Sequence, residues 1–173
     1  PYILGISGGA AVAALAAILL GASALWISNA AFAGALLSIA IVFGIARASG
    51  AWSSTRLLLT GVVVSAGWGA MINILLTTSA NNSVYSMLFW LMGDLSQSSA
   101  GWISTGILLL GFMLMMWQAR AMNVLARGDL QAEALGVNVP RLKLFLYFAT
   151  SVLTACAVTI AGSIGFVGLV IPH

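Results

Sequence analysis

Residues 120–143, RAMNVLARGDLQAEALGVNVPRLK, form a polar island between two long apolar stretches. The island contains four of the six basic residues in the chain and two of its three acids. A segment this charged lies in water at a membrane face, while its uncharged neighbours dissolve in lipid. The polar island therefore separates two membrane-crossing segments.

A short helix is predicted inside the polar island. Gly128-Asp129 marks its start, because the Asp129 carboxylate can accept hydrogen bonds from the free amides of a first turn. Gly136 marks its end, because glycine readily adopts the left-handed conformation that closes a helix. The apolar residues that the helix places on one face are Leu130, Ala134 and Leu135. Pro140 then suits the first turn of a second short element that leads into the next apolar run.

This pattern allows two interpretations. A rigid surface helix with one apolar face and flanking charges is typical of a docking surface for a soluble partner. An ordinary amphipathic helix lying on the lipid headgroups has the same local pattern. The residues of the polar island alone do not choose between them.

The composition is that of an integral membrane protein. The 173 residues are 62% hydrophobic and 5% charged, against roughly 25% charged in soluble domains. The net charge of +3 would favour nucleic acid in a soluble protein, but basic residues confined to loops indicate membrane orientation instead. Because the chain starts at Pro-Tyr and stops at Ile-Pro-His, we expect an internal fragment of one transmembrane domain. That domain covers residues 1–173 and is incomplete at both ends.

About five apolar runs are long enough to span a membrane. They cover residues 4–25, 30–46, 57–76, 102–117 and 144–160. A turn at Ser28-Asn29 is predicted between the first two. Residues 84–92 are too few to cross a hydrocarbon core about 30 Å thick, so they form an interfacial helix. The glycine-rich residues 162–172 predict a bent segment buried in protein.

The basic residues fix the orientation of these segments. With these crossings, the loops at residues 47–56 and 120–143 share one side of the membrane and hold all six basic residues. The positive-inside rule makes these two loops cytoplasmic and residues 78–101 external. The predicted location is therefore the cytoplasmic membrane, crossed several times.

Small residues recur every four positions in two segments. The first stripe is Gly5, Gly9, Ala13, Ala17 and Gly21. Such a stripe lets helices pack closely in lipid. The second stripe, which is also polar, is Gly61, Ser65, Gly69 and Asn73. Asparagine in a span is costly unless it meets water or another helix, so this face either lines an aqueous path or makes interhelical hydrogen bonds.

Catalytic chemistry is not indicated anywhere in the chain. His173 stands at the end of the sequence, and the acids Asp94, Asp129 and Glu133 fall in loops. An ion-coupled carrier usually needs carboxylates within its spans, and no glycine-rich loop for nucleotide phosphate is present. We therefore expect no catalytic residue, metal site or cofactor in this chain, and an energy source in another one.

Several motifs give the chain a resemblance to a known family. They are residues 1–10 (PYILGISGGA), 55–66 (TRLLLTGVVVSA), 89–97 (FWLMGDLSQ), 128–137 (GDLQAEALGV) and 161–173 (AGSIGFVGLVIPH). In this order they resemble the FecCD-type permease subunits of ABC importers for iron-siderophores, haem and cobalamin. The resemblance implies about ten spans per full subunit, a second permease subunit, cytoplasmic ATPase subunits that bind ATP and Mg, and an extracytoplasmic binding protein. Nucleic acid is not an expected partner.

The resemblance also implies roles for particular residues. Residues 129–136 and 137–141 match two short cytoplasmic helices that dock into the ATPase. The docking residues it implies are Asp129, Leu130, Glu133, Leu135, Gly136, Pro140 and Arg141. Ser54 and Thr55 match a loop that closes the cytoplasmic end of the path. Residues 57–76 match the helix that lines the path, so Gly61, Ser65, Gly69 and Asn73 are expected to line it.

The expected fold is an all-α polytopic membrane bundle with about five spans, short interfacial helices and a cytoplasmic coupling segment at residues 120–143. The expected function is ATP-driven import of an iron-siderophore-type chelate by alternating access. A helical scaffold or an ATP-independent channel remains the alternative. A membrane enzyme is disfavoured, because no cluster of His, Asp or Glu faces a common depth.

Overall fold

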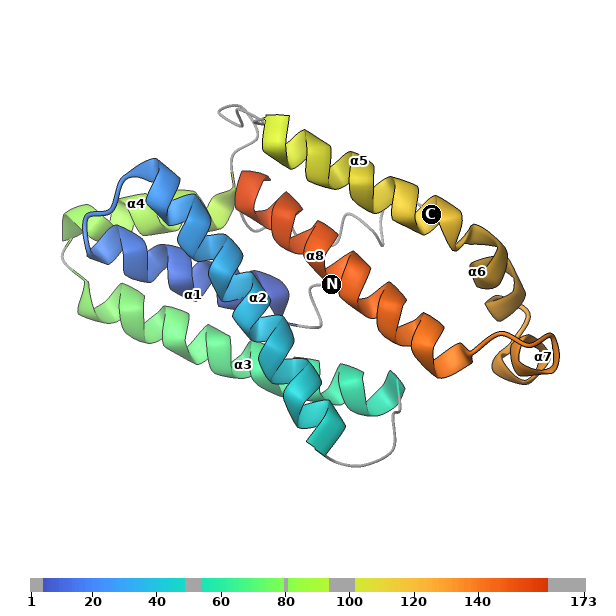
Figure 1. Ribbon diagram of the computed structural model, residues 1–173. Coiled ribbons are helices and arrows are strands. Elements are labelled where there is room, and N and C mark those ends of the chain that lie inside the picture. The colour runs from blue at the N-terminus through green and yellow to red at the C-terminus, as the bar shows by residue number, and fades with distance from the viewer. Residues whose placement is uncertain (1–4, 49–53, 80, 94–101, 162–173) are drawn as a thin grey trace. The chain divides into compact units, whose positions relative to one another are not determined.

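A computed structural model describes residues 5–48, 54–79, 81–93 and 102–161, and every regular element in these ranges is an α-helix (Figure 1). The predicted all-α class is confirmed. The helices form two compact groups, one from residues 1–99 with 154–173 and the other from residues 100–153. The single transmembrane domain stays a prediction.

The first group is built around α1 (Ile6–Leu19), which packs against α2 (Ala24–Ala48) and α3 (Ser54–Thr78) and also contacts α4 (Asn81–Met92) (Figure 1). Its buried core consists mainly of small and branched side chains. They are Ile6, Ala10, Ala14, Ala31, Ala35, Ile39, Ala155 and Val158. Small residues let the helix axes approach closely, and packing of this kind holds helices together in lipid.

The first predicted segment is shorter than the sequence suggested. α1 has 14 residues, which at a rise of about 1.5 Å per residue gives a length of about 21 Å. The predicted turn at Ser28-Asn29 is wrong, because both residues lie inside α2. The chain turns at Gly21, whose φ is +71°. Ser28 is accommodated in the helix because its hydroxyl donates to the carbonyl of Ala24 at 3.1 Å.

Gly9 and Gly34 allow α1 and α2 to approach closely. A Cβ added at Gly9 would lie 2.6 Å from the carbonyl oxygen of Gly34 and 2.6 Å from the Cβ of Ser38. Ordinary carbon contacts are about 3.5–4.0 Å. The first small-residue stripe is therefore a helix contact, except at Gly21, where an added Cβ would meet nothing within 4 Å.

A buried polar chain joins α3 to the other two helices. The indole N–H of Trp68 donates to the Ser38 hydroxyl at 2.9 Å, and this hydroxyl donates to the Gly5 carbonyl at 2.8 Å. The Ser38 side chain is fully buried. Gly5 is the N-cap of α1, and its carbonyl also accepts a hydrogen bond from the Gly9 N–H at 3.0 Å. Each polar atom in this chain thus has a partner away from lipid.

The second group contains α5 (Trp102–Trp117), α6 (Ala119–Leu125), α7 (Asp129–Ala134) and the beginning of α8 (Val139–Ala161). α5 has the bounds predicted for the fourth span. α6 continues from it after a bend of 58°. The Leu153 side chain of α8 closes against Gly111 of α5, where a Cβ would not fit.

Helix length and composition agree with a membrane location. By these criteria α2, α3 and α8 are each able to cross a membrane, and α5 with α6 forms a fourth, broken span if the pair is counted as one. α4 has 12 residues, which confirms the short helix predicted between two spans. The glycine-rich residues 162–172, with Asp94 and His173, lie outside the described residues.

Candidate functional site

The helix predicted in the polar island is α7, and its C-terminal end is built as expected. Gly136 has a φ of +81°. Its N–H donates to the carbonyl of Glu133 at 2.9 Å, and the N–H of Val137 donates to that of Ala132 at 2.9 Å. This pair of bonds is the Schellman closure, which satisfies carbonyls that a helix end otherwise leaves free.

The predicted capping role of Asp129 is wrong. Gly128 occupies the N-cap position with no side-chain cap, and Asp129 is the first helical residue. Its carboxylate accepts a hydrogen bond from the Lys143 ammonium of α8, 2.5 Å away. A lysine on another helix therefore competes successfully with the local amides. Asp129 still lies favourably at the positive end of the helix dipole.

The outer face of α7 presents apolar side chains to its surroundings. Leu130 is 85% exposed and Leu135 is 68% exposed, whereas Ala132 on the opposite side is completely buried. Glu133 and Arg141 are also exposed beside this face. An apolar ridge with a carboxylate and a guanidinium next to it has the chemistry of a protein-docking surface.

The second short element predicted at Pro140 is wrong. Residues 139–161 form one continuous helix, α8. Asn138 caps it, because its side-chain oxygen accepts a hydrogen bond from the Arg141 N–H at 3.2 Å. Pro140 occupies the first turn, where its missing N–H is no loss. The chain thus passes from α7 into α8 without a separate helix.

The predicted path residues all lie on α3, in different surroundings. Gly61 is buried, Ser65 and Gly69 are half-buried, and Asn73 is exposed. Ser65 and Gly69 line a cavity of about 350 Å³ between α3 and α1. The Ser65 hydroxyl donates to the carbonyl of Val62 in its own helix at 2.8 Å, so the interhelical bond proposed for this stripe is not formed by Ser65. The path role stays a prediction.

The predicted gate residues begin α3 instead of lying in a loop. Ser54 and Thr55 are its first two residues, and Thr55 is exposed. α2 extends to Ala48, so only residues 49–53 separate the two helices. Both residues nevertheless lie at the basic end of α3, the side predicted to be cytoplasmic.

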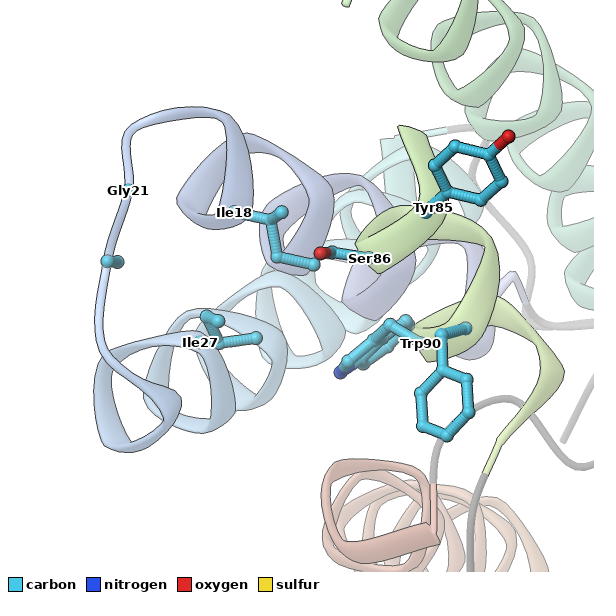
Figure 2. A pocket seen from close by; sticks show the side chains of 8 residues that line it. Ile18, Gly21, Ile27, Tyr85, Ser86 and Trp90 are labelled. Atoms are coloured by element: carbon cyan, nitrogen blue, oxygen red, sulfur yellow. The ribbon is translucent and has the colours of Figure 1, made fainter. Parts of the chain in front are cut away.

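A second cavity of about 630 Å³ lies in the first group, between the α1–α2 turn and α4 (Figure 2). Ile18 and Ile27 face Trp90 and Ser86 across it, whereas Tyr85 points outward in Figure 2. Its volume and mostly apolar lining are those of a ligand pocket, but its residues lie far in sequence from the polar island. We assign it no role in docking.

Metal chemistry finds no support among the described residues, where no group of three or more His, Cys, Asp or Glu could hold an ion. Sequence reasoning missed two features of the second group, Lys143 as the partner of Asp129 and α6 as a helix within the polar island. The good helix formers Ala, Met and Leu in residues 119–125 were the available signal for α6.

Known proteins resemble this chain over its whole length. It is 41% identical to the cobalamin import system permease protein BtuC of Halobacterium salinarum and 36% identical to the hemin transport system permease protein HmuU of Yersinia pestis. These alignments cover 100% of the chain and 47% and 54% of the two relatives. The chain thus spans about half the length of the curated relatives it matches.

A solved structure has the same fold. It is a metal-chelate type ABC transporter in an inward-facing conformation, with a TM-score of 0.85 and 30% sequence identity. The match covers 100% of this chain and 56% of that one. The family model extends over residues 1–173. The chain belongs to the FecCD transport family.

Proposed function

We propose that this chain is part of the permease subunit of an ATP-driven importer that carries a metal chelate across the cytoplasmic membrane of a prokaryote. The observation that carries the proposal is the apolar ridge of Leu130 and Leu135, exposed on the basic side of a family member. A cytoplasmic ATPase that covers this ridge supplies the energy and binds ATP and Mg. This chain itself is not an enzyme.

The partners follow from the same proposal. A second permease subunit completes the path, and an extracytoplasmic binding protein delivers the chelate. Movement of the ATPase displaces α7, and the bundle opens its path alternately to the two sides. Ser54 and Thr55 close the cytoplasmic end, and the face of α3 with Ser65 and Gly69 lines the path.

The substrate class is a large chelate. Gly61, Ser65, Gly69 and Asn73 carry no charge, and a wall of small, weakly polar residues suits a bulky substrate that must not bind tightly. Within this class we propose an iron-siderophore chelate. The relatives described above are named for cobalamin and hemin, so uptake of labelled ferric hydroxamate, cobalamin and haem into cells with the full-length permease separates the three.

Docking is tested with the full-length permease and its ATPase. Leu130→Glu removes the most exposed apolar side chain of α7. Burial of a leucine contributes about 1.5–3 kcal/mol, so ATPase binding should weaken about 10- to 150-fold. Arg120→Glu is the control, because it places the same carboxylate on α6, outside α7.

Co-purification and uptake are the measurements. The expected result is loss of the ATPase and of uptake with Leu130→Glu, and retention of both with Arg120→Glu. Unchanged assembly and uptake with Leu130→Glu would contradict the docking role. They would favour the alternative of a scaffold or an ATP-independent channel.

A further inference from the structure

A short closed turn and one ion pair connect α7 to the base of α8. At the C-terminal end of α7, the turn at Gly136 is closed by backbone hydrogen bonds of 2.9 Å, and Asn138 caps α8 directly afterwards. At the N-terminal end, Asp129 is bound to Lys143, which lies in the second turn of α8. The ion pair therefore restrains the end of α7 that lies farther from this turn.

The connection from α7 back to α5 is looser. α6 meets α5 at a bend of 58°, where the hydrogen bond from the Gln118 N–H to the Leu114 carbonyl is 3.4 Å long. α6 itself packs against α7, and the N–H of Gly128, the N-cap of α7, donates to the Leu125 carbonyl of α6 at 3.0 Å. Between them, Gly128 has a φ of +116° and provides no side-chain cap.

We propose that Lys143 is a positioning residue that makes α7 and the first turns of α8 one mechanical body. This inference rests on the docking role proposed for α7. Displacement of α7 by the ATPase then moves α8 directly, whereas α5 follows through the bend at Gln118. Lys143 contacts neither substrate nor nucleotide, and it acts through Asp129 on the orientation of the docking ridge.

The partial burial of the ion pair fits this role. The Lys143 side chain is 30% exposed and that of Asp129 is 57% exposed, so the pair contributes little to stability as a surface contact. Its position is what matters, because it restrains the end of α7 that lies farther from the connection to α8. Loss of the pair should raise the population of swivelled α7 about two- to fivefold.

The inference is tested by measuring distances between spin labels in the full-length permease. Labels are attached to Gln131→Cys on α7 and Phe148→Cys on α8, two exposed positions, in a Cys156→Ala background. Double electron–electron resonance reports the distribution of the distance between them. It is recorded for the permease alone, and for the complex with its ATPase in nucleotide-free and vanadate-trapped states.

With Lys143 intact we expect one narrow distribution that is the same in all three states. Lys143→Gln should broaden the distance distribution, because the minor population with a swivelled α7 becomes about two to five times as large as in the parent. Lys143→Arg and the exchange of Asp129→Lys with Lys143→Asp should restore the narrow form. The control Arg120→Gln removes a basic residue from α6 on the same side and should change nothing.

Two results would overturn the inference. One is a label distance that shifts between nucleotide states while Lys143 is intact, because α7 would then move relative to α8. The other is a distribution that stays narrow with Lys143→Gln. The comparison of Lys143→Gln with the parent is made on the permease alone and needs no ATPase. If the ATPase does not bind, the proposed function is refuted, but this comparison still tests the role of Lys143.

Discussion

The contact between α1 and α2 provides the sharpest test of the fold, through the substitution Gly34→Ala. A Cβ at this position would lie 2.5 Å from the Cβ of Ala13 and closer still to the carbonyl oxygen of Gly9. The two helices must then separate, because a backbone carbonyl cannot rotate away as a side chain can. Overpacking of this kind costs about 1–3 kcal/mol.

Gly44, which also lies in α2, provides a matched control. A Cβ added at Gly44 would meet nothing within 4 Å, so Gly44→Ala gains about 0.5–1 kcal/mol of helix propensity without the steric cost. Gly34→Ala gains the same stability from helix propensity but loses stability because its Cβ overpacks the contact with α1. The difference in stability between the two variants therefore isolates the helix contact, at about 1–3 kcal/mol.

The assay is thermal unfolding of the full-length permease in detergent, followed by tryptophan fluorescence. At roughly 2–4 °C per kcal/mol, the midpoint of Gly34→Ala should fall several degrees below that of Gly44→Ala. Gly67→Ala in α3, which also meets open space, should behave like Gly44→Ala. Equal midpoints for all three variants would show that α1 and α2 are not in close contact at Gly34.

Three further predictions concern the buried polar chain, the end of α7 and the topology. Ser38→Ala should lower the free energy of unfolding by about 1–3 kcal/mol, more than Trp68→Phe at about 0.5–1.5 kcal/mol, because Ser38→Ala removes both hydrogen bonds and leaves the Trp68 N–H unpaired, whereas Trp68→Phe leaves the bond from Ser38 to the Gly5 carbonyl in place; the reverse order in thermal unfolding would contradict this. Gly136→Ala should lower the stability of the α7 end by about 1–2 kcal/mol, because alanine is strained at a positive φ, and it should speed amide exchange in α7. Gly136→Asn should stay closer to the parent in both measurements, because asparagine tolerates this conformation. The cysteine of Arg127→Cys should react with an impermeant maleimide only in inverted vesicles, and the cysteine of Tyr85→Cys should react in intact cells. The opposite labelling pattern would contradict the predicted topology.

Features that depend on local composition were predictable from the sequence. The bounds of α5, the short length of α4 and the glycine closure of α7 all follow from apolar run length or from the conformational freedom of Gly136. Each of these properties is carried by residues close together in sequence.

Features that depend on a partner distant in sequence were not predictable. Asp129 looked like a helix cap because its local amides are available, but Lys143 lies 14 residues away and binds it instead. The error at Ser28-Asn29 was local instead: both residues are polar and looked like a turn, yet a serine hydroxyl bonded to a carbonyl four residues earlier fits within a helix. Among the candidate site residues, the sequence identified the exposed apolar residues of α7 but not Lys143, which binds Asp129.

The same kind of backbone hydrogen-bonded closure at a glycine ends both α1 and α7. The turn after α1 is closed by N–H groups of Gly21 and Ala22 bonded to carbonyls of the last helical turn, each at 3.0 Å, and α7 is closed in the same way at Gly136. α1 is about 21 Å long, so in a hydrocarbon core of about 30 Å at least one of its ends stops short of water. Unpaired backbone groups at that depth would cost several kcal/mol each. The closure at Gly21 removes part of this cost from within the chain, and the packing of α4 against α1 gives the short helix a protein neighbour. At α7 the same closure satisfies carbonyls of the last turn, so this short helix also ends without unpaired backbone groups there.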